Sequence, residues 1–454
     1  MLNWIWLAFL LVAVLVGGVT GRLPEMTKGA FETAETAVMK IALPLAGLMA
    51  IWLGIMRLAE RSGLVQGIAR LLQPLMRRLF PEVPPEHPAM GAMVMNMAAN
   101  LLGLGNAATP LGLRAMTHLE RLNPHPGTAT NAMCTFLAIN TASIQLVPTT
   151  AIALLAVAGS ANPTAIVPTA FLATVCAATC GVFAAKFLER LPMFRAPAHG
   201  AAEGASQAET GGAKEVKDEV VEVERVEVKP LSTVGVLLLV GFVACFVVFF
   251  LGLAFPGLIP FGAGVADAAK AGAAQGPVLR SLSAVSVLAV PFLLTFFPLY
   301  AALRGVKVYE QFVEGARESF GVAQRIIPFL VAMLVAVRML REAGVIDLMT
   351  RTLGPVLSAL HFPVDLLPMV LMRPLSGSAT QGLFVEVINR LGPDSLTSRI
   401  AGTIYGSTET TFYVLAVYFG SVAVRHTRHA VLAGLTADFI AVVASVTLCQ
   451  LIFG

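Results

Sequence analysis

Charged residues are scarce in this sequence. They make up 13% of its 454 residues, whereas a soluble globular domain carries about 25%. Hydrophobic residues reach 57%, and the mean hydropathy is +0.79. A composition this poor in charge excludes an ordinary soluble domain and indicates that lipid surrounds most of the chain.

Motifs of several functional classes are missing as well. No glycine-rich Walker sequence followed by Lys-Ser or Lys-Thr occurs, so the chain encodes no nucleotide-driven motor. Gly103-Leu-Gly105 lacks the preceding strand and the third glycine of a dinucleotide fingerprint. No basic run resembles a nucleic-acid patch, and the five cysteines and seven histidines show no zinc spacing. We therefore expect no enzyme, no metal or organic cofactor and no nucleic-acid partner.

Long apolar runs are what the sequence has instead. A helix needs about 20 apolar residues to cross a hydrocarbon core of roughly 30 Å. Barrel strands would alternate apolar and polar residues, so continuous runs predict helices. The runs cover residues 2–21, 88–113, 122–185, 231–266 and 281–303. We expect an all-α, multi-pass integral membrane protein, with residues 2–21 kept as a helix because they lack the charged start of a signal peptide.

One stretch breaks the apolar pattern. Residues 196–230 are rich in Ala, Gly, Glu and Lys. They cannot bury enough apolar surface to fold alone, which predicts a soluble charged linker. The linker divides the chain into two membrane halves, residues 1–195 and 231–454.

The two halves repeat a short signature. Its members are the pairs Arg57 and Arg338, Gly63 and Gly344, and Pro74 and Pro355, each 281 positions apart (338 − 57). In both halves the signature ends an apolar helix and opens an amphipathic one, over residues 63–80 and 344–360. Such helices lie in the membrane interface, although ordinary cytoplasmic loops with positive residues would look the same. Arginines follow the signature in both halves, so the sequence leaves inverted and parallel repeats open.

Polar and helix-breaking residues interrupt four apolar segments, two in each half. Irregular backbone at membrane depth must be buried in protein or line a water-filled cavity, and transporters bind ions and polar solutes at broken helices. Small polar residues also join membrane helices to one another, which is the alternative. The matching places in both halves favour a polar cavity. Its candidate residues are Asn96, Asn100, Asn106, Thr109, Asn140, Thr141 and Ser143, with Arg373, Ser376, Ser378, Thr380, Ser407, Thr408, Glu409 and Thr410 from the second half.

Charges inside apolar segments are the sharpest signal. A charge at a helix centre costs at least about 2.5–3.5 kcal/mol on insertion scales. If Glu409 and Arg373 face one cavity, they form an ion pair or contact a charged solute, and Glu409 alternatively carries a proton. Arg373 otherwise lies near a helix end and extends to the interface. We expect Asp438 and Lys40 to lie near interfaces.

At these motifs the sequence resembles a known family. The first half resembles spore maturation protein A, and the second half resembles spore maturation protein B. The matching stretches are residues 52–60, 87–93, 100–110, 131–141, 306–310, 371–378 and 406–420. The resemblance implies the nucleoside recognition, or Gate-domain, group. It implies two pseudo-symmetric Gate-type repeats with broken or re-entrant helices and interfacial amphipathic helices.

These expectations combine into one main hypothesis. We expect a secondary transporter of the bacterial cytoplasmic (inner) membrane, with a small polar or charged solute bound between the two repeats near the membrane midplane. A proton or Na⁺ is the expected coupling ion, membrane lipid is the expected surrounding, and a homo-oligomer is compatible with the sequence. The rival hypothesis is a scaffold or regulator of cell-envelope (spore or peptidoglycan) maturation, which docks its partners through the linker. A membrane enzyme using Glu409 is a weaker third, since no second catalytic group supports it.

Overall fold

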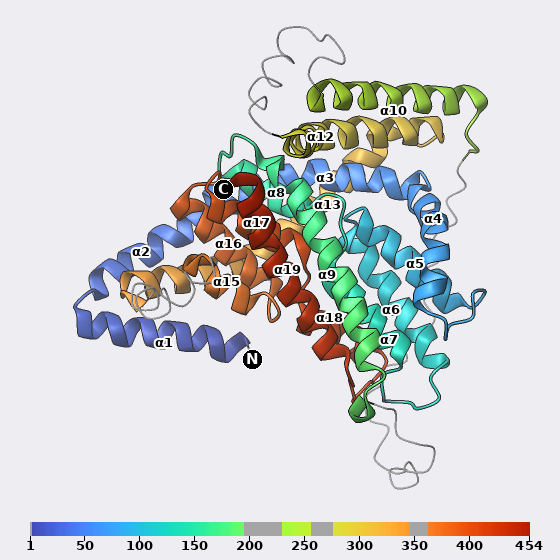
Figure 1. The fold of residues 1–454 in the computed structure, drawn as a ribbon. Coiled ribbons are helices and arrows are strands. Elements are labelled where there is room, and N and C mark those ends of the chain that lie inside the picture. The colour runs from blue at the N-terminus through green and yellow to red at the C-terminus, as the bar shows by residue number, and fades with distance from the viewer. Residues whose placement is uncertain (1, 195–228, 256–275, 346–361) are drawn as a thin grey trace.

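The computed structural model describes residues 2–194, 229–255, 276–345 and 362–454. These residues form helices joined by short loops, and the pairing of Thr128 with His426 is an isolated β-bridge. Figure 1 shows the helices and their labels. The prediction of an all-α protein is confirmed for this part of the chain.

The first half contributes nine α-helices before the linker. They are α1 (Leu2–Thr20), α2 (Leu23–Thr36), α3 (Leu43–Arg61), α4 (Leu64–Leu79), α5 (Pro88–Leu101), α6 (Gly105–Arg121), α7 (Asn131–Ala142), α8 (Thr149–Val157) and α9 (Ile166–Leu188). A π-helical turn, η1 (Ala37–Ala42), joins α2 to α3, and short 3₁₀ turns η2 (Pro163–Ala165) and η3 (Pro192–Phe194) flank α9.

The second half has a matching series. Its described helices are α10 (Thr233–Ala254), α12 (Pro277–Leu303), α13 (Val308–Glu342), α15 (Leu367–Met372), α16 (Gly377–Leu391), α17 (Leu396–Ser407), α18 (Thr411–Ser421) and α19 (Ala430–Phe453), with the 3₁₀ turn η4 (Val364–Leu366) before α15. In both halves a helix, a tight tip, a second helix, a loop, a broken helix and a long final helix follow one another. The cap positions match, because Thr130 caps α7 and Ser395 caps α17 with their hydroxyls.

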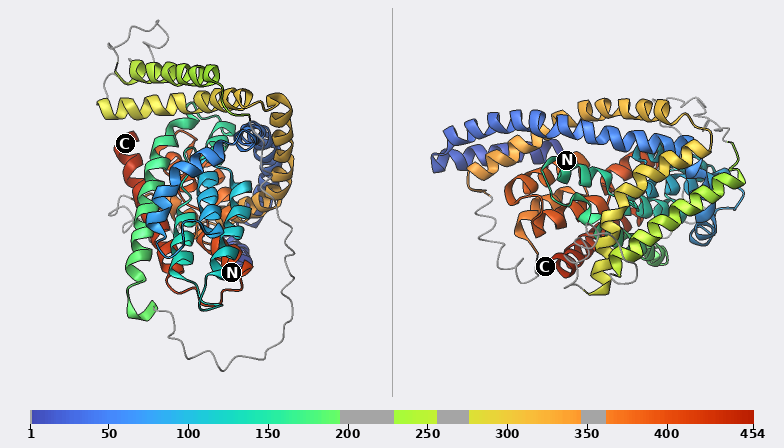
Figure 2. Two further views of the ribbon diagram at one scale, coloured as in Figure 1. Left: turned by 90° about the vertical axis from the view of Figure 1, so that its right-hand side faces the viewer. Right: turned by 90° about the horizontal axis from the view of Figure 1, so that it is seen from above.

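Six helical segments of the described chain are long and apolar enough to cross a membrane. They are residues 23–61, 163–188, 233–254, 277–303, 308–342 and 430–453. α10 has the highest hydropathy of these, and few of its residues are buried, which suits contact with lipid. Figures 1 and 2 show α10 and α12 side by side along one edge, with α12 in turn packed on α3.

The repeats are inverted, which the sequence left open. At one end of the bundle Asp394, before α17, accepts a hydrogen bond from Ser160, after α8 (2.7 Å). At the opposite end the amides of Arg425 and His426, after α18, donate to the carbonyl of Gly127, before α7 (2.8 and 3.0 Å). The α7–α8 and α17–α18 pairs therefore run in opposite directions, as Figure 1 shows.

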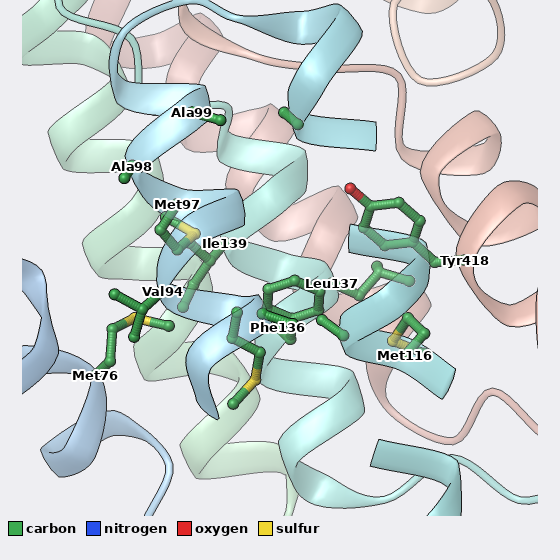
Figure 3. Packing of buried hydrophobic residues seen from close by; sticks show 14 of the residues in the cluster. Met76, Val94, Met97, Ala98, Ala99, Met116, Phe136, Leu137, Ile139 and Tyr418 are labelled. Atoms are coloured by element: carbon green, nitrogen blue, oxygen red, sulfur yellow. The ribbon is translucent and has the colours of Figure 1, made fainter. Parts of the chain in front are cut away.

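The main hydrophobic core joins α4, α5, α6 and α7 to α18 of the other half. Phe136 and Tyr418 stack with ring centroids 5.9 Å apart, and methionines such as Met76, Met97 and Met116 fill the surrounding space (Figure 3). A second cluster surrounds the equivalent helices of the second half and includes Phe384. Each of the two cores contains residues from both halves, so neither repeat packs as a separate unit.

The predicted amphipathic helix of the first half is present as α4. It buries Val65, Ala69 and Met76 and exposes Arg70. Residues 346–360 of the second predicted amphipathic helix, including Pro355, and the linker up to residue 228 lie outside the described residues. Their predicted structures stay predictions.

We predict opposite effects for two glycines of α3. A Cβ on Gly54 would lie 2.6 Å from the ring of Phe312 and 2.9 Å from its carbonyl oxygen on α13, whereas a Cβ on Gly47 meets nothing within 4 Å. Gly54→Ala should lower the free energy of unfolding by about 1–3 kcal/mol through overpacking. Gly47→Ala should be neutral or stabilising by up to about 1 kcal/mol, because alanine favours helices. Thermal unfolding in detergent measures both, and equal effects would contradict this account of the α3–α13 contact.

We also predict an acid-dependent contribution from Asp394. Hydrogen bonds from the Ser160 hydroxyl and from the Ala161 amide hold the pKa of this loop carboxyl below its usual 3.8. A lowered pKa stabilises the fold above pH 3.8, and this contribution is lost as the pH falls below that value. Asp394→Asn should be less stable than the wild type at neutral pH, and the two melting temperatures should converge in acid. The exposed Glu310→Gln serves as a control and should follow the wild type throughout; parallel curves for Asp394→Asn would contradict the prediction.

Candidate functional site

The first half has a hairpin tip that meets a helix break. α5 and α6 are joined at residues 102–104, where Gly103 has a left-handed backbone (φ 77°). The α7–α8 break spans residues 143–148 and starts at Ser143, which is also left-handed (φ 43°) and ends α7. The amide of Leu146 in the break donates to the carbonyl of Leu101 at the tip (2.9 Å). This hydrogen bond joins a backbone amide freed by the helix break to a backbone carbonyl freed at the hairpin tip.

The second half repeats this arrangement. α15 and α16 meet at residues 373–376, and the α17–α18 break spans residues 408–410. The amide of Phe412, just after the break, donates to the carbonyl of Pro374 at the tip (3.0 Å). The Ser376 hydroxyl accepts a hydrogen bond from the Ala379 amide and so caps α16.

The two breaks meet each other. The amide of Glu409 donates to the carbonyl of Thr141, at the end of α7, over 2.7 Å. We call the two tips (102–104 and 373–376), the two breaks (143–148 and 408–410) and the helix ends beside them the polar centre. The sequence predicted the four interruptions, and the structure brings them together between the halves.

Arg373 joins the second tip to the second break. It is 4% exposed. Its Nε donates to Thr408 Oγ1 (2.8 Å), its Nη2 donates to the carbonyl oxygens of Tyr405 (2.9 Å) and Thr408, and its guanidinium lies 4.8 Å from the centre of the Tyr405 ring. Arg373 therefore binds the last carbonyls of α17, where a cation is favoured.

Two sequence-based readings of Arg373 are wrong. The side chain does not extend to the interface, because it is buried. It also forms no ion pair with Glu409 among the described residues, because its donors already bind protein oxygens. Arg373 binds these oxygens because the second tip packs against the second break, a contact that the sequence does not show.

Three asparagines and a tyrosine connect the halves. Asn100 donates to Asn140 Oδ1 (2.9 Å), and Asn96 donates to the Ala108 carbonyl (2.7 Å) and the Tyr418 hydroxyl (3.3 Å). The Tyr418 hydroxyl donates to Asn140 Oδ1 (3.3 Å). Sequence reasoning missed Tyr418, although a hydroxyl inside an apolar helix close to Glu409 is a usable signal.

Most predicted hydroxyl groups of the site have partners within the protein. The Thr380 hydroxyl donates to the Ser376 carbonyl (2.7 Å), and Ser407 Oγ lies 3.4 Å from Ser445 Oγ. Ser143 Oγ accepts from Gln145 Nε2 (3.1 Å), and Gln145 is a second polar side chain that the sequence did not single out. Ser378 is half-buried, 3.3 Å from Ser376. Thr109 lies in the first turns of α6, and the side chain of Asn106 lies outside the described residues.

A few polar groups of the centre remain without a partner in the described part of the chain. The hydroxyl groups of Thr141 and Thr410 are buried and form no hydrogen bond. The Glu409 carboxylate is half-buried and has no hydrogen bond or ion pair there either. These groups, rather than Arg373, are available to a bound molecule.

The expected place of Asp438 is wrong as well. It lies within α19 and is 5% exposed, not at an interface. Its Oδ2 accepts a hydrogen bond from the Thr411 hydroxyl (2.6 Å), at the start of α18. Asp438 therefore belongs to the polar centre. The signal was the same as for Glu409, a single acid in a helix otherwise without charge.

A cavity of ≈ 160 Å³ lies elsewhere, between α9, α12, α17 and α19. Asn162, Thr169, Ser286 and Arg399 are among its lining residues, and none of the predicted site residues is.

Comparison with known proteins now decides the family. The profile of the Gate family, described as nucleoside recognition, matches residues 42–189 and 323–425. The chain belongs to this family. The two matched segments contain α3 to α9 and the last part of α13 to α18, and thus all four interruptions of the polar centre.

Two curated relatives come from Bacillus subtilis (strain 168). Spore maturation protein A is 41% identical over 175 residues, which are 38% of this chain and 89% of the relative. Spore maturation protein B is 42% identical over 170 residues, which are 37% of this chain and 96% of the relative. No solved structure matches. With six apolar segments in its described residues, this Gate-family protein is a multi-pass protein of the bacterial inner membrane.

We predict that Arg373 is required for stability more than for binding. Arg373→Ala leaves the buried carbonyls of Tyr405 and Thr408 without donors, which should cost about 3 kcal/mol or more. Arg373→Lys keeps the charge but loses the fork and the ring contact, so it should also be destabilised, by less. The exposed Arg317→Ala, whose ion pair is at the surface, should cost less than about 0.5 kcal/mol. Unfolding in detergent measures all three, and a stable Arg373→Ala would contradict the prediction.

Proposed function

We propose that this protein is a secondary transporter that carries a small polar solute across the inner membrane, with the solute bound at the polar centre. The contact between the two breaks, from the Glu409 amide to the Thr141 carbonyl, supports the proposal most directly. It brings four half-helix ends and an unpartnered carboxylate to one place between inverted repeats. Secondary transporters bind their substrates at such places.

The charges of the polar centre favour one class of solute. The only guanidinium there, among the described residues, already binds the end of α17. The groups left over are the Glu409 carboxylate and the hydroxyl and amide groups near it. A carboxylate held away from water favours a cation or a strong hydrogen-bond donor. We therefore propose a solute with an amine or several donor groups rather than a carboxylate or phosphate.

Inverted repeats also supply a route for alternating access. Two halves of similar sequence that run in opposite directions can exchange their conformations, so that the site opens first to one side and then to the other. The loop contacts at the two ends of the bundle, Asp394 with Ser160 and Arg425 with Gly127, are equivalent under this exchange. They are the contacts that opening would break in turn.

One observation favours the scaffold alternative. Asn96 donates to a carbonyl of α6 and Ser407 contacts Ser445 of α19, as expected of polar residues that join helices. In that case the protein would organise envelope-building proteins through the predicted linker, residues 196–230. The relatives' names refer to spore maturation, which suits either role.

Ligand binding and uptake test the proposal. A solute that binds only the folded protein raises its melting temperature, by about 2.7 kcal/mol of stabilisation at a hundredfold excess over Kd. We expect hits among amines and nucleoside-like donors, and gradient-driven uptake of the same compounds into liposomes. Glu409→Gln should reduce uptake at least about tenfold, equivalent to 1.4 kcal/mol, and the exposed Glu310→Gln should not.

Deleting residues 196–230 separates the two roles. A transporter should keep most of its uptake, because the residues of the polar centre remain. A scaffold should lose its cellular role while the purified protein stays folded. No uptake and no thermal shift over the whole panel would contradict transport.

A further inference from the structure

Asp438 has a carboxylate that the protein satisfies only in part. Its Oδ2 accepts a hydrogen bond from Thr411, whereas its Oδ1 has no hydrogen-bond partner among the described residues, although the side chain is 95% buried (5% exposed). No ion pair of the described chain includes it. A buried carboxylate is stabilised by a cation or by a full set of donors.

The charged groups around Asp438 do not supply that cation. Arg373 and Glu409 are close enough to interact with it electrostatically. The Arg373 guanidinium already binds the Tyr405 and Thr408 carbonyls. Glu409 adds a second negative charge. Two carboxylates and one guanidinium leave one net negative charge around Asp438.

Gly434 lies one helical turn before Asp438, on the same face of α19. A Cβ there would lie 2.9 Å from the Thr411 methyl group and 3.4 Å from the hydroxyl oxygens of both Thr141 and Thr411. The Thr141 hydroxyl is fully buried and has no hydrogen-bond partner among the described residues. The glycine thus lets two hydroxyl groups, one beside each break, pack directly against the backbone of α19.

The end of α7 adds further negative potential. Its last residue is Ala142, whose carbonyl accepts a hydrogen bond from the Thr174 hydroxyl, and the Thr141 carbonyl accepts one from the Glu409 amide. Carbonyl groups at the carboxyl end of a helix carry a partial negative charge. Transporters use the carboxyl ends of half-helices, together with unwound backbone, to hold Na⁺.

We propose that Asp438, Thr411 and Thr141 bind one Na⁺ ion beside Gly434. The ligands are hard oxygens, which suit Na⁺, and a single carboxylate suits one positive charge better than a divalent ion, which needs more carboxylates. The inference rests on the proposed transport function, for which this ion would be the coupling ion. It is separate from the solute site at Glu409.

The site also explains how the ion would couple to the solute. Thr141 belongs to the end of the first broken helix, and Thr411 begins α18 after the second break. An ion held by both would fix the breaks against α19. Glu409 lies in the second break, so the ion would organise the solute site as it binds.

The first test measures the solute-free, full-length protein in detergent. We compare melting temperatures in NaCl, KCl and choline chloride at equal ionic strength. Na⁺ should raise the melting temperature by several degrees in a saturable way, and K⁺ and choline should not. Equal effects of the three salts would overturn the proposal. The proposal would also be overturned if Na⁺ leaves the melting temperature unchanged while acid raises it, and if Asp438→Asn abolishes the effect of acid. That result would assign a proton site to Asp438.

Two threonines of α7 form a matched pair of variants. Thr141→Val removes a ligand of the proposed site, whereas Thr135→Val removes a hydroxyl that is equally buried and equally unpartnered, on the same helix. Thr141→Val should raise the Na⁺ concentration for half-maximal stabilisation about tenfold, the loss expected for one ligand bond. Thr135→Val should leave it unchanged. If the Na⁺ dependence of the melting temperature is the same in both variants as in the wild type, the proposal fails. This test does not require that Asp438→Asn folds.

Uptake measurements keep this inference distinct from the proposed function. Na⁺-specific stabilisation without solute uptake would keep the ion site and remove the transport role. Uptake that does not depend on Na⁺, with no Na⁺-specific stabilisation, would keep transport and remove the site.

Discussion

Backbone groups freed by broken helices must find partners inside the protein, and the polar centre depends on this constraint. In lipid no water replaces a lost helical hydrogen bond. Here each hairpin tip pairs with the break of its own half, through Leu101 with Leu146 and through Pro374 with Phe412. The pairing of Glu409 with Thr141 then joins the halves. The arrangement of the helices around the centre follows from these few contacts.

The repeats share a backbone arrangement but differ in chemistry. Thr174 and Asp438 occupy equivalent positions, each nine residues after the cap of α9 or α19, at Ala165 and His429. Thr174 donates to the Ala142 carbonyl at one break, whereas Asp438 accepts from Thr411 at the other. One half thus uses neutral amides and hydroxyls, and the other half uses charges. An asymmetric site results from a nearly symmetric fold.

The sequence predicted the membrane helices, the repeat and the four interruptions, because hydropathy and helix-breaking residues are local signals. It did not predict the role of Arg373 or the depth of Asp438. Both depend on which segment lies opposite, and Arg373 meets Thr408 only because the tip and the break come together. Inversion of the repeats likewise follows from loops far apart in sequence, such as residues 127 and 426. The assignment of the other candidate residues of the polar cavity to a binding site stays a prediction.

The balance of charge at the polar centre limits what can bind there. Among the described residues its charged side chains are Arg373, Glu409 and Asp438, and the arginine is used to neutralise the end of α17. Two carboxylates remain, close to each other and to the carboxyl end of α7, one of them buried and the other half-buried. The charge of Arg373 balances only one of them, and negative charge inside a membrane protein is stabilised by compensating positive charge. A cationic solute or a bound metal ion would supply the second positive charge in a conformation in which both acids are ionised.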